Sequence, residues 1–157
     1  MRTKLFMRVY CCLSSYLLFF ATLFASLLPA ADWHVGPHGA PIGNGGPSAP
    51  WDLATALSHP GSVVPGDTVW IHGGVYSGAY VSSLHGTVGA PIIIRNWNNE
   101  RAILNTSHPG LEIRGSHSWY WGVEITNDLT KAPSPNTRTV TVRDCDSARL
   151  INCVIHD

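Results

Sequence analysis

The 157-residue chain has no formal net charge when its histidines are neutral, because ten Lys and Arg residues balance ten Asp and Glu residues. Charged residues make up only 13% of the sequence, where about 25% is usual for a soluble domain. Without a basic excess the chain lacks the attraction with which proteins bind phosphate backbones, so nucleic acid is excluded as an expected partner.

The N-terminal segment 1–31 has the pattern of an export signal. Arg2, Lys4 and Arg8 precede an apolar run over 9–28, and the small residues Ala30 and Ala31 follow as a cleavage site. The competing interpretation is a signal anchor, because about twenty apolar residues can span a bilayer. We predict a signal peptide over 1–31, a domain over 32–157, and a secreted, periplasmic or cell-surface location.

After this segment the sequence is typical of short strands separated by turns. The Gly- and Pro-rich stretch 33–51 predicts little regular structure, and "PWDLATALSHPG" predicts a single helix from about Trp51 to Ser58. Short alternating runs then predict strands at Thr68–Ile71, Ala79–Val81, Ile92–Arg95, Ala102–Leu104, Leu111–Arg114, Trp119–Thr126, Thr139–Arg143 and Arg149–Ile155.

An internal repeat indicates how these strands are arranged. "LEIRGSHS" from Leu111 matches "VTVRDCDS" from Val140, and "GVEITN" from Gly122 matches "NCVIHD" from Asn152. Such a repeat predicts a solenoid of short strands stacked about 4.8 Å apart, with the helix covering the open end of the first coil. The residues expected inside are Val69, Ile71, Ile92, Ile94, Leu111, Ile113, Val140 and Val142, and Arg114 is expected directly over Arg143.

Four segments carry a resemblance: "PGDTVWIHGGVYSG", "GTVGAPIIIRNW", "LEIRGSHSWYWGVEITN" and "LINCVIHD". In this order they resemble the N-terminal part of the secreted right-handed parallel β-helix proteins of the pectate-lyase-like superfamily, with the branch of chondroitinase B and alginate lyases the most similar. The resemblance implies an all-β, right-handed parallel β-helix with an N-terminal cap and about two to three coils. It also implies that the chain is a fragment, incomplete at its C-terminus.

The same resemblance implies an exported protein that acts on an acidic polysaccharide by β-elimination. The alternative is a non-catalytic carbohydrate-binding or surface structural β-helix, because this fold hosts many functions. The catalytic residues stay unknown, since in these lyases they lie in later coils, and this chain alone is expected to be inactive. No cofactor is expected in this part, and calcium is left open for the full-length protein.

Three residues are candidates for binding substrate. The repeat stacks Arg114 and Arg143, whose guanidinium groups suit sugar carboxylates, and Arg95 is a further candidate for that stack. The alternative is that the arginines are solvated and balanced by Glu112, Asp144 and Asp146. Trp119 is a candidate for stacking on a sugar, with core packing as its alternative. No metal site is expected, because the close pair Asp144 and Asp146 offers too few oxygens for calcium.

The expected partner is a polysaccharide, with no membrane contact after signal cleavage. A second expectation is self-association through the last coil, where Leu150, Ile151, Val154 and Ile155 present apolar side chains beside unpaired strand edges.

Overall fold

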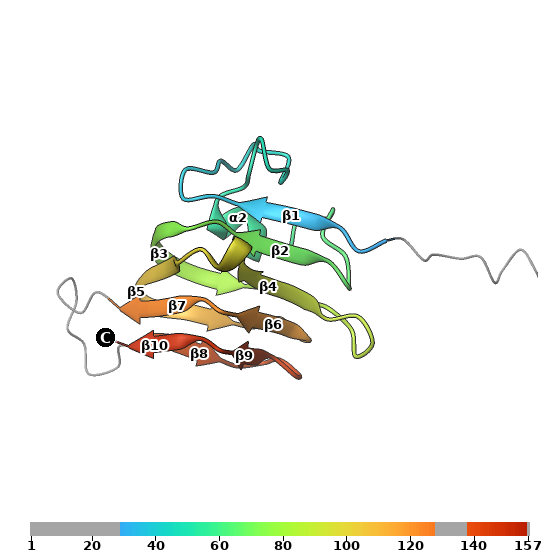
Figure 1. Cartoon of the computed structure of the whole chain (residues 1–157). Coiled ribbons are helices and arrows are strands. Elements are labelled where there is room, and N and C mark those ends of the chain that lie inside the picture. Colours follow the sequence, from blue (N-terminus) through green and yellow to red (C-terminus); the bar gives the residue numbers. More distant parts are fainter. Residues whose placement is uncertain (1–28, 128–137, 157) are drawn as a thin grey trace, which may run out of the picture.

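A computed structural model describes residues 29–127 and 138–156, so most of the predicted signal peptide lies outside the described residues. Within the described part, no helix has the length and apolar character needed to cross a membrane. The described residues are mostly parallel β-structure with very little helix (Figure 1).

One sheet contains five parallel strands in the order β1-β2-β4-β6-β9. Its members are β1 (Asp32–Val35), β2 (Thr68–Ile71), β4 (Ile92–Asn96), β6 (Ser118–Trp121) and β9 (Arg149–Ile151). Each strand pairs with the strand of the next coil, and the chain between the two strands forms a loop or a part of the second sheet.

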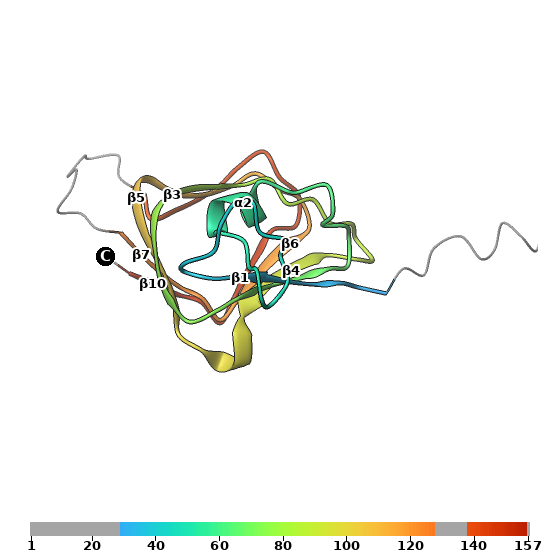
Figure 2. The same cartoon turned by 90° about the horizontal axis from the view of Figure 1, so that it is seen from above.

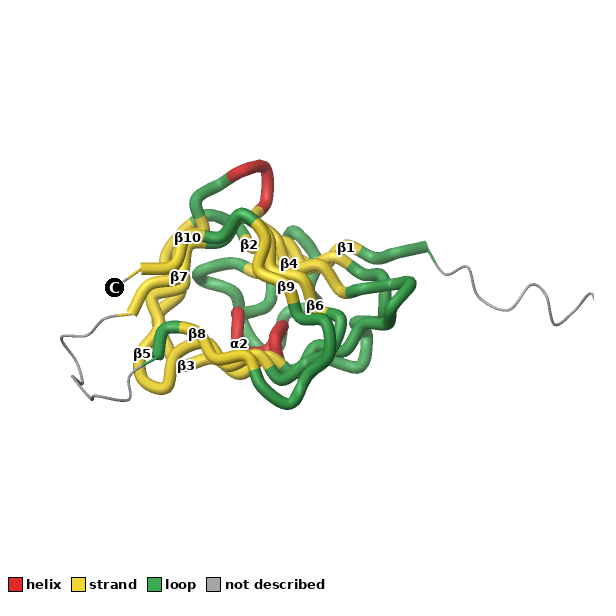
Figure 3. The backbone as a smooth tube through the Cα atoms, turned by 90° about the horizontal axis from the view of Figure 1, so that it is seen from below, coloured by secondary structure: helices red, strands yellow, loops and turns green. Residues whose placement is uncertain are grey.

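The second sheet has the order β10-β7-β5-β3, also parallel. Its members are β3 (Gly74–Ser82), β5 (Ala102–Ile113), β7 (Glu124–Asn127) and β10 (Val154–His156), and β8 (Val140–Val142) pairs with the end of β5. The chain therefore winds in coils, and the end-on views show the strands stacked around a common interior (Figures 2 and 3).

Alternation along the strands fills this interior. Val69 and Ile71 of β2 and Ile92 and Ile94 of β4 are fully buried, as the sequence predicts. Tyr120 of β6 is also fully buried, and its hydroxyl hydrogen-bonds to Ser82 Oγ. Because successive side chains of a strand point to opposite faces, the intervening residues face outward.

The register of the repeat is confirmed, whereas one burial prediction is wrong. Leu111 pairs with Val140 and Ile113 with Val142, as the matched segments require. Leu111 and Ile113 are fully buried and Val140 is partly buried, but Val142 is 50% exposed. Among the described residues the strand of Val142 pairs only with β5, and no further coil covers the Val142 side chain. Leu150, Val154 and Ile155 are exposed too, and self-association through them stays a prediction.

The helix α2 (Leu53–Leu57) confirms the predicted one with shorter ends, and it lies within the outline of the coil (Figure 2). Asp52 caps it by accepting a hydrogen bond from Thr55 N, and Leu53, Ala56 and Leu57 are buried. A short 3₁₀ turn, η1 (Trp97–Asn99), projects at the corner after β4.

Strand boundaries differ from the prediction in two ways. β1 forms at the start of the Gly- and Pro-rich stretch because it pairs with β2 and because Trp33 stacks on Trp51 at 5.0 Å between ring centroids. The predicted strand over 119–126 is divided into β6 and β7 by Gly122, whose φ of 71° makes a corner that favours glycine.

An ion-pair network joins Arg101, which directly precedes β5, to Glu124 of β7 and His156 of β10. Arg101 Nε and Nη2 lie 2.8 and 2.9 Å from the two carboxylate oxygens of Glu124, and His156 Nε2 lies 3.0 Å from one of them. These hydrogen bonds, the one from Arg101 foremost, lower the pKa of Glu124 from 4.5 to about 2.

This network predicts an acid-dependent stability. A folded-state pKa below the unfolded one stabilises the fold fully above pH 4.5, and the stabilisation is lost as the pH falls through about 2. Glu124→Gln should therefore lower the melting temperature at pH 6 and have progressively less effect toward pH 2. Thermal melts across this range, with exposed Asp144→Asn as the control, test it. A pH-independent difference between wild type and Glu124→Gln would contradict it.

Candidate functional site

The predicted arginine pair gathers around one carboxylate on the outer face of β5 and β8. Glu112 lies in β5, and only 6% of its surface is exposed. Arg114 Nε lies 3.0 Å from Glu112 Oε1, and Arg143 Nε hydrogen-bonds to the same oxygen. The two arginines are therefore neighbours on one face, as the repeat predicts.

These contacts fix the charge of the cluster. The hydrogen bond from Arg114, followed by the one from Arg143, lowers the pKa of Glu112 and outweighs the effect of desolvation, so this carboxyl is ionised at neutral pH. The bond to Glu112 in turn raises the pKa of Arg114. Two guanidinium groups lie against this one carboxylate, and the charge of Asp144, which is exposed in the loop after β8, also interacts favourably with Arg114.

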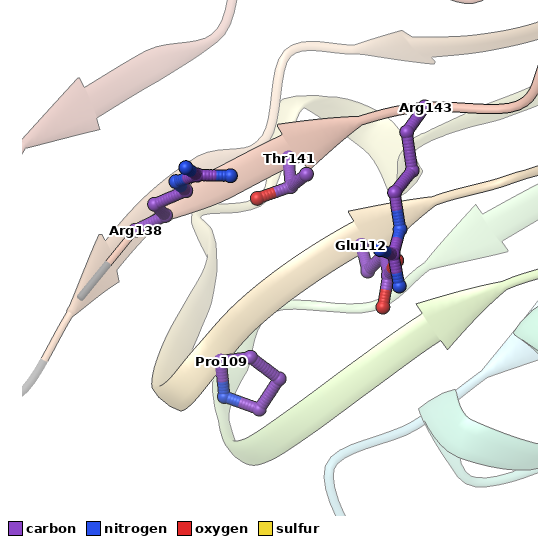
Figure 4. A pocket seen from close by; sticks show the side chains of 5 residues that line it. All are labelled: Pro109, Glu112, Arg138, Thr141 and Arg143. Carbon is purple, nitrogen blue, oxygen red and sulfur yellow. The ribbon is translucent and has the colours of Figure 1, made fainter. Parts of the chain in front are cut away.

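A hollow of about 240 Å³ lies beside this cluster (Figure 4). It is lined by Pro109, Glu112, Arg138, Thr141 and Arg143, with Arg138 near Thr141 and with Arg143 facing Glu112. Arg138 has no ion pair with any described residue. The lining thus offers guanidinium and hydroxyl donors to an anion. Among the described lining residues the only carboxylate is that of Glu112, which already contacts two arginines. These residues are therefore suited to binding an anion, and none of them offers a free base to remove a proton.

Trp119 lies apart from the arginine cluster, on the other sheet. It belongs to β6, where fully buried Tyr120 points inward and half-buried Trp119 points outward, as alternation requires. Arg149 lies over its ring, with Cζ 4.5 Å from the ring centroid. The three predicted binding residues therefore form two separate groups.

Arg95 does not join the stack of Arg114 and Arg143, which corrects the prediction for it. It lies in β4 between the rings of Trp70 and Trp121, with Cζ 5.0 and 5.2 Å from their centroids. The repeat that relates β5 to β8 does not relate these three residues, because the coils that join β2, β4 and β6 are shorter. An alignment of "TVWI", "IIIRN" and "SWYW" is the signal that could have found this row.

Metal binding finds no support among the described side chains. In ranges 29–127 and 138–156, no group of three or more His, Cys, Asp or Glu residues is close enough to hold an ion.

No protein-family model and no curated protein sequence matches this chain. Among solved structures, it is similar to pectate lyase Pel9A, with 23% identity over 61% of this chain and 28% of that one, at a TM-score of 0.47. It is also similar to a mannuronic acid-specific polysaccharide family 6 lyase from the human gut microbiota, with 17% identity over 73% of this chain and 26% of that one, at a TM-score of 0.47. The chain spans about a quarter of the length of each structure, and similarities at this level do not assign it to a family.

Proposed function

We propose that this chain belongs to an exported, right-handed parallel β-helix protein that acts on an acidic polysaccharide by β-elimination. In this proposal helix α2 caps the first coil, about two to three coils follow, and the protein is secreted, periplasmic or attached to the cell surface. The observation that carries it is the hollow beside the Glu112 cluster, which combines an excess of guanidinium charge with a cavity of about 240 Å³.

The described residues supply only one of the two groups that β-elimination requires. β-Elimination from a uronic acid needs a cation to neutralise the carboxylate and a base to remove the proton beside it. Arg138 and Arg143 fit the first role, because planar guanidinium groups bind carboxylates through two parallel hydrogen bonds. We assign no catalytic base, and calcium in the full-length protein stays part of the proposal.

The second candidate function is carbohydrate binding without catalysis. The specific observation in its favour is that Glu112 is held by two arginines, which leaves the hollow without a free base.

Titration calorimetry with alginate, pectate and chondroitin sulfate tests binding, and ultraviolet absorbance of unsaturated products tests elimination. We expect binding that Arg143→Ala and Arg138→Ala each weaken by about tenfold or more, as the loss of a charged hydrogen bond implies. Arg101→Ala, which removes an exposed arginine paired with Glu124, is the matched control. For this chain alone we expect no unsaturated product. Absence of binding to all three polymers would refute the proposal. A rise in absorbance that Arg143→Ala abolishes would mean that this chain itself catalyses the elimination.

A further inference from the structure

The outer face of the sheet β1-β2-β4-β6-β9 carries two rows of aromatic and cationic side chains. The parallel register places Trp70, Arg95 and Trp121 in one row across β2, β4 and β6. It places Trp119 and Arg149 in the adjacent row across β6 and β9. Each residue of the first row, and Trp119, adjoins a fully buried residue in its strand, and Arg149 is itself exposed, so both rows lie on the outside of the coil.

Contacts between neighbours hold these side chains in place. Arg95 lies between two indole rings, with Cζ 5.0 Å from the centroid of Trp70 and 5.2 Å from that of Trp121. Trp70 also donates a hydrogen bond of 2.7 Å to Asp32 Oδ1 and meets Trp97 edge-on at 5.2 Å between centroids. Cation–π contacts of this length stabilise a pair by roughly 0.5–1 kcal/mol at exposed sites. The surface is therefore largely ordered before any ligand arrives, which favours binding.

The charges of this face resemble those of the hollow, where Arg138 also has no ion pair with a described residue. Arg101, Arg114 and Arg143 are all paired with carboxylates, whereas Arg95 and Arg149 have no ion pair with any described residue. Two buried donors without a hydrogen-bond partner, Arg95 Nε and Trp119 Nε1, lie in the same two rows. Unpaired buried donors are costly, and because neighbouring atoms cover both of these, a ligand acceptor would reach them only after a shift of the covering side chains.

We infer that these two rows form a second binding surface, for an acidic polysaccharide that lies along the coil axis. This rests on the proposed function but uses residues outside the hollow. Strand β4 presents the cation Arg95, β6 presents the rings of Trp119 and Trp121, and β9 presents the cation Arg149. The backbone positions of Arg95 and Arg149 are on the order of 12 Å apart. This order matches a polymer whose acidic sugars alternate with uncharged ones. A nucleic acid, with phosphates about every 3.4 Å along each strand, has a far denser charge.

Calorimetry and tryptophan fluorescence measure the binding of hyaluronan oligosaccharides to the purified full chain. Hyaluronan carries a carboxylate on alternate sugars. Arg95→Ala and Arg149→Ala should each weaken binding at least fivefold, while Arg101→Ala leaves it unchanged. Because Arg149 is exposed, its substitution leaves the fold intact, and circular dichroism checks this for both variants. Dextran, which is neutral, should not bind.

The two sites are separated by their variants. If Arg143→Ala and Arg138→Ala weaken hyaluronan binding while Arg95→Ala and Arg149→Ala do not, the proposed function stands and this surface is refuted. If only Arg95→Ala and Arg149→Ala weaken binding, the surface stands without the hollow. Equal effects of Arg95→Ala, Arg149→Ala and Arg101→Ala, or dextran binding as tight as hyaluronan binding, would overturn the inference.

Discussion

Asp67→Ala is expected to lower the free energy of unfolding by about 3 kcal/mol or more. Asp67 is fully buried, and its carboxylate accepts three hydrogen bonds, from Ala31 N at 2.8 Å, Trp33 Nε1 at 2.8 Å and Val64 N at 2.9 Å. Alanine accepts none of them, so three donors in and around the first coil lose their partner together. Urea unfolding followed by circular dichroism measures the loss.

Two further variants separate this carboxylate from acidic residues in general. Asp67→Asn retains one acceptor oxygen but places an amide NH₂ against a backbone donor, so an intermediate loss is expected. Asp52→Ala removes the cap of α2 and should cost about 1 kcal/mol. If Asp67→Ala costs no more than Asp52→Ala, the three hydrogen bonds do not organise the first coil.

Much of the fold could be predicted from the sequence because its signals are local. Alternation in "TVWI" and "IIIRN" determines which side chains are buried, and the match of Leu111 with Val140 gives the register of β5 and β8. Strand β1 could not be predicted this way. It is followed by Gly and Pro residues, and it forms through pairing with β2 and through the contact between Trp33 and Trp51, which a long loop separates in sequence.

The candidate site was less accessible to sequence reasoning. The repeat correctly brings Arg114 beside Arg143, and the alternative in which Glu112 balances them is confirmed by its contacts with both. The sequence could not decide between this alternative and free arginines, because the contacts depend on side-chain reach. The repeat also could not place Arg95, since loop lengths change the spacing from one strand pair to the next. The chain from β2 to β4, and from β4 to β6, makes a shorter turn than the chain from the end of β5 to β8. When the coils of a solenoid differ in length, a row such as Trp70, Arg95 and Trp121 can be recognised only after the strand pairing is known.

Gly115→Ala, at the corner between β5 and β6, is expected to be strongly disruptive for a single added methyl group. A Cβ at Gly115 would overlap the carbonyl group of Leu84. Backbone of the preceding coil cannot move aside as a flexible side chain can, and Gly115 N also donates a hydrogen bond of 3.1 Å to Ser82 O. Relieving the clash would break this bond and shift two coils, at an expected loss of at least about 3 kcal/mol.

Gly89→Ala is the matched control, because nothing lies within 4 Å of a Cβ at that exposed position. Its effect should stay below about 1 kcal/mol in either direction, since alanine there mainly restricts the unfolded chain. Both variants are compared with wild type by urea unfolding and by the yield of folded protein. Similar stabilities for Gly115→Ala and Gly89→Ala would mean that adjacent coils are not in close backbone contact at Leu84. Since that contact fixes how the chain leaves β5 for β6, the placement of Trp119 and Trp121 on the outer face would then be wrong as well.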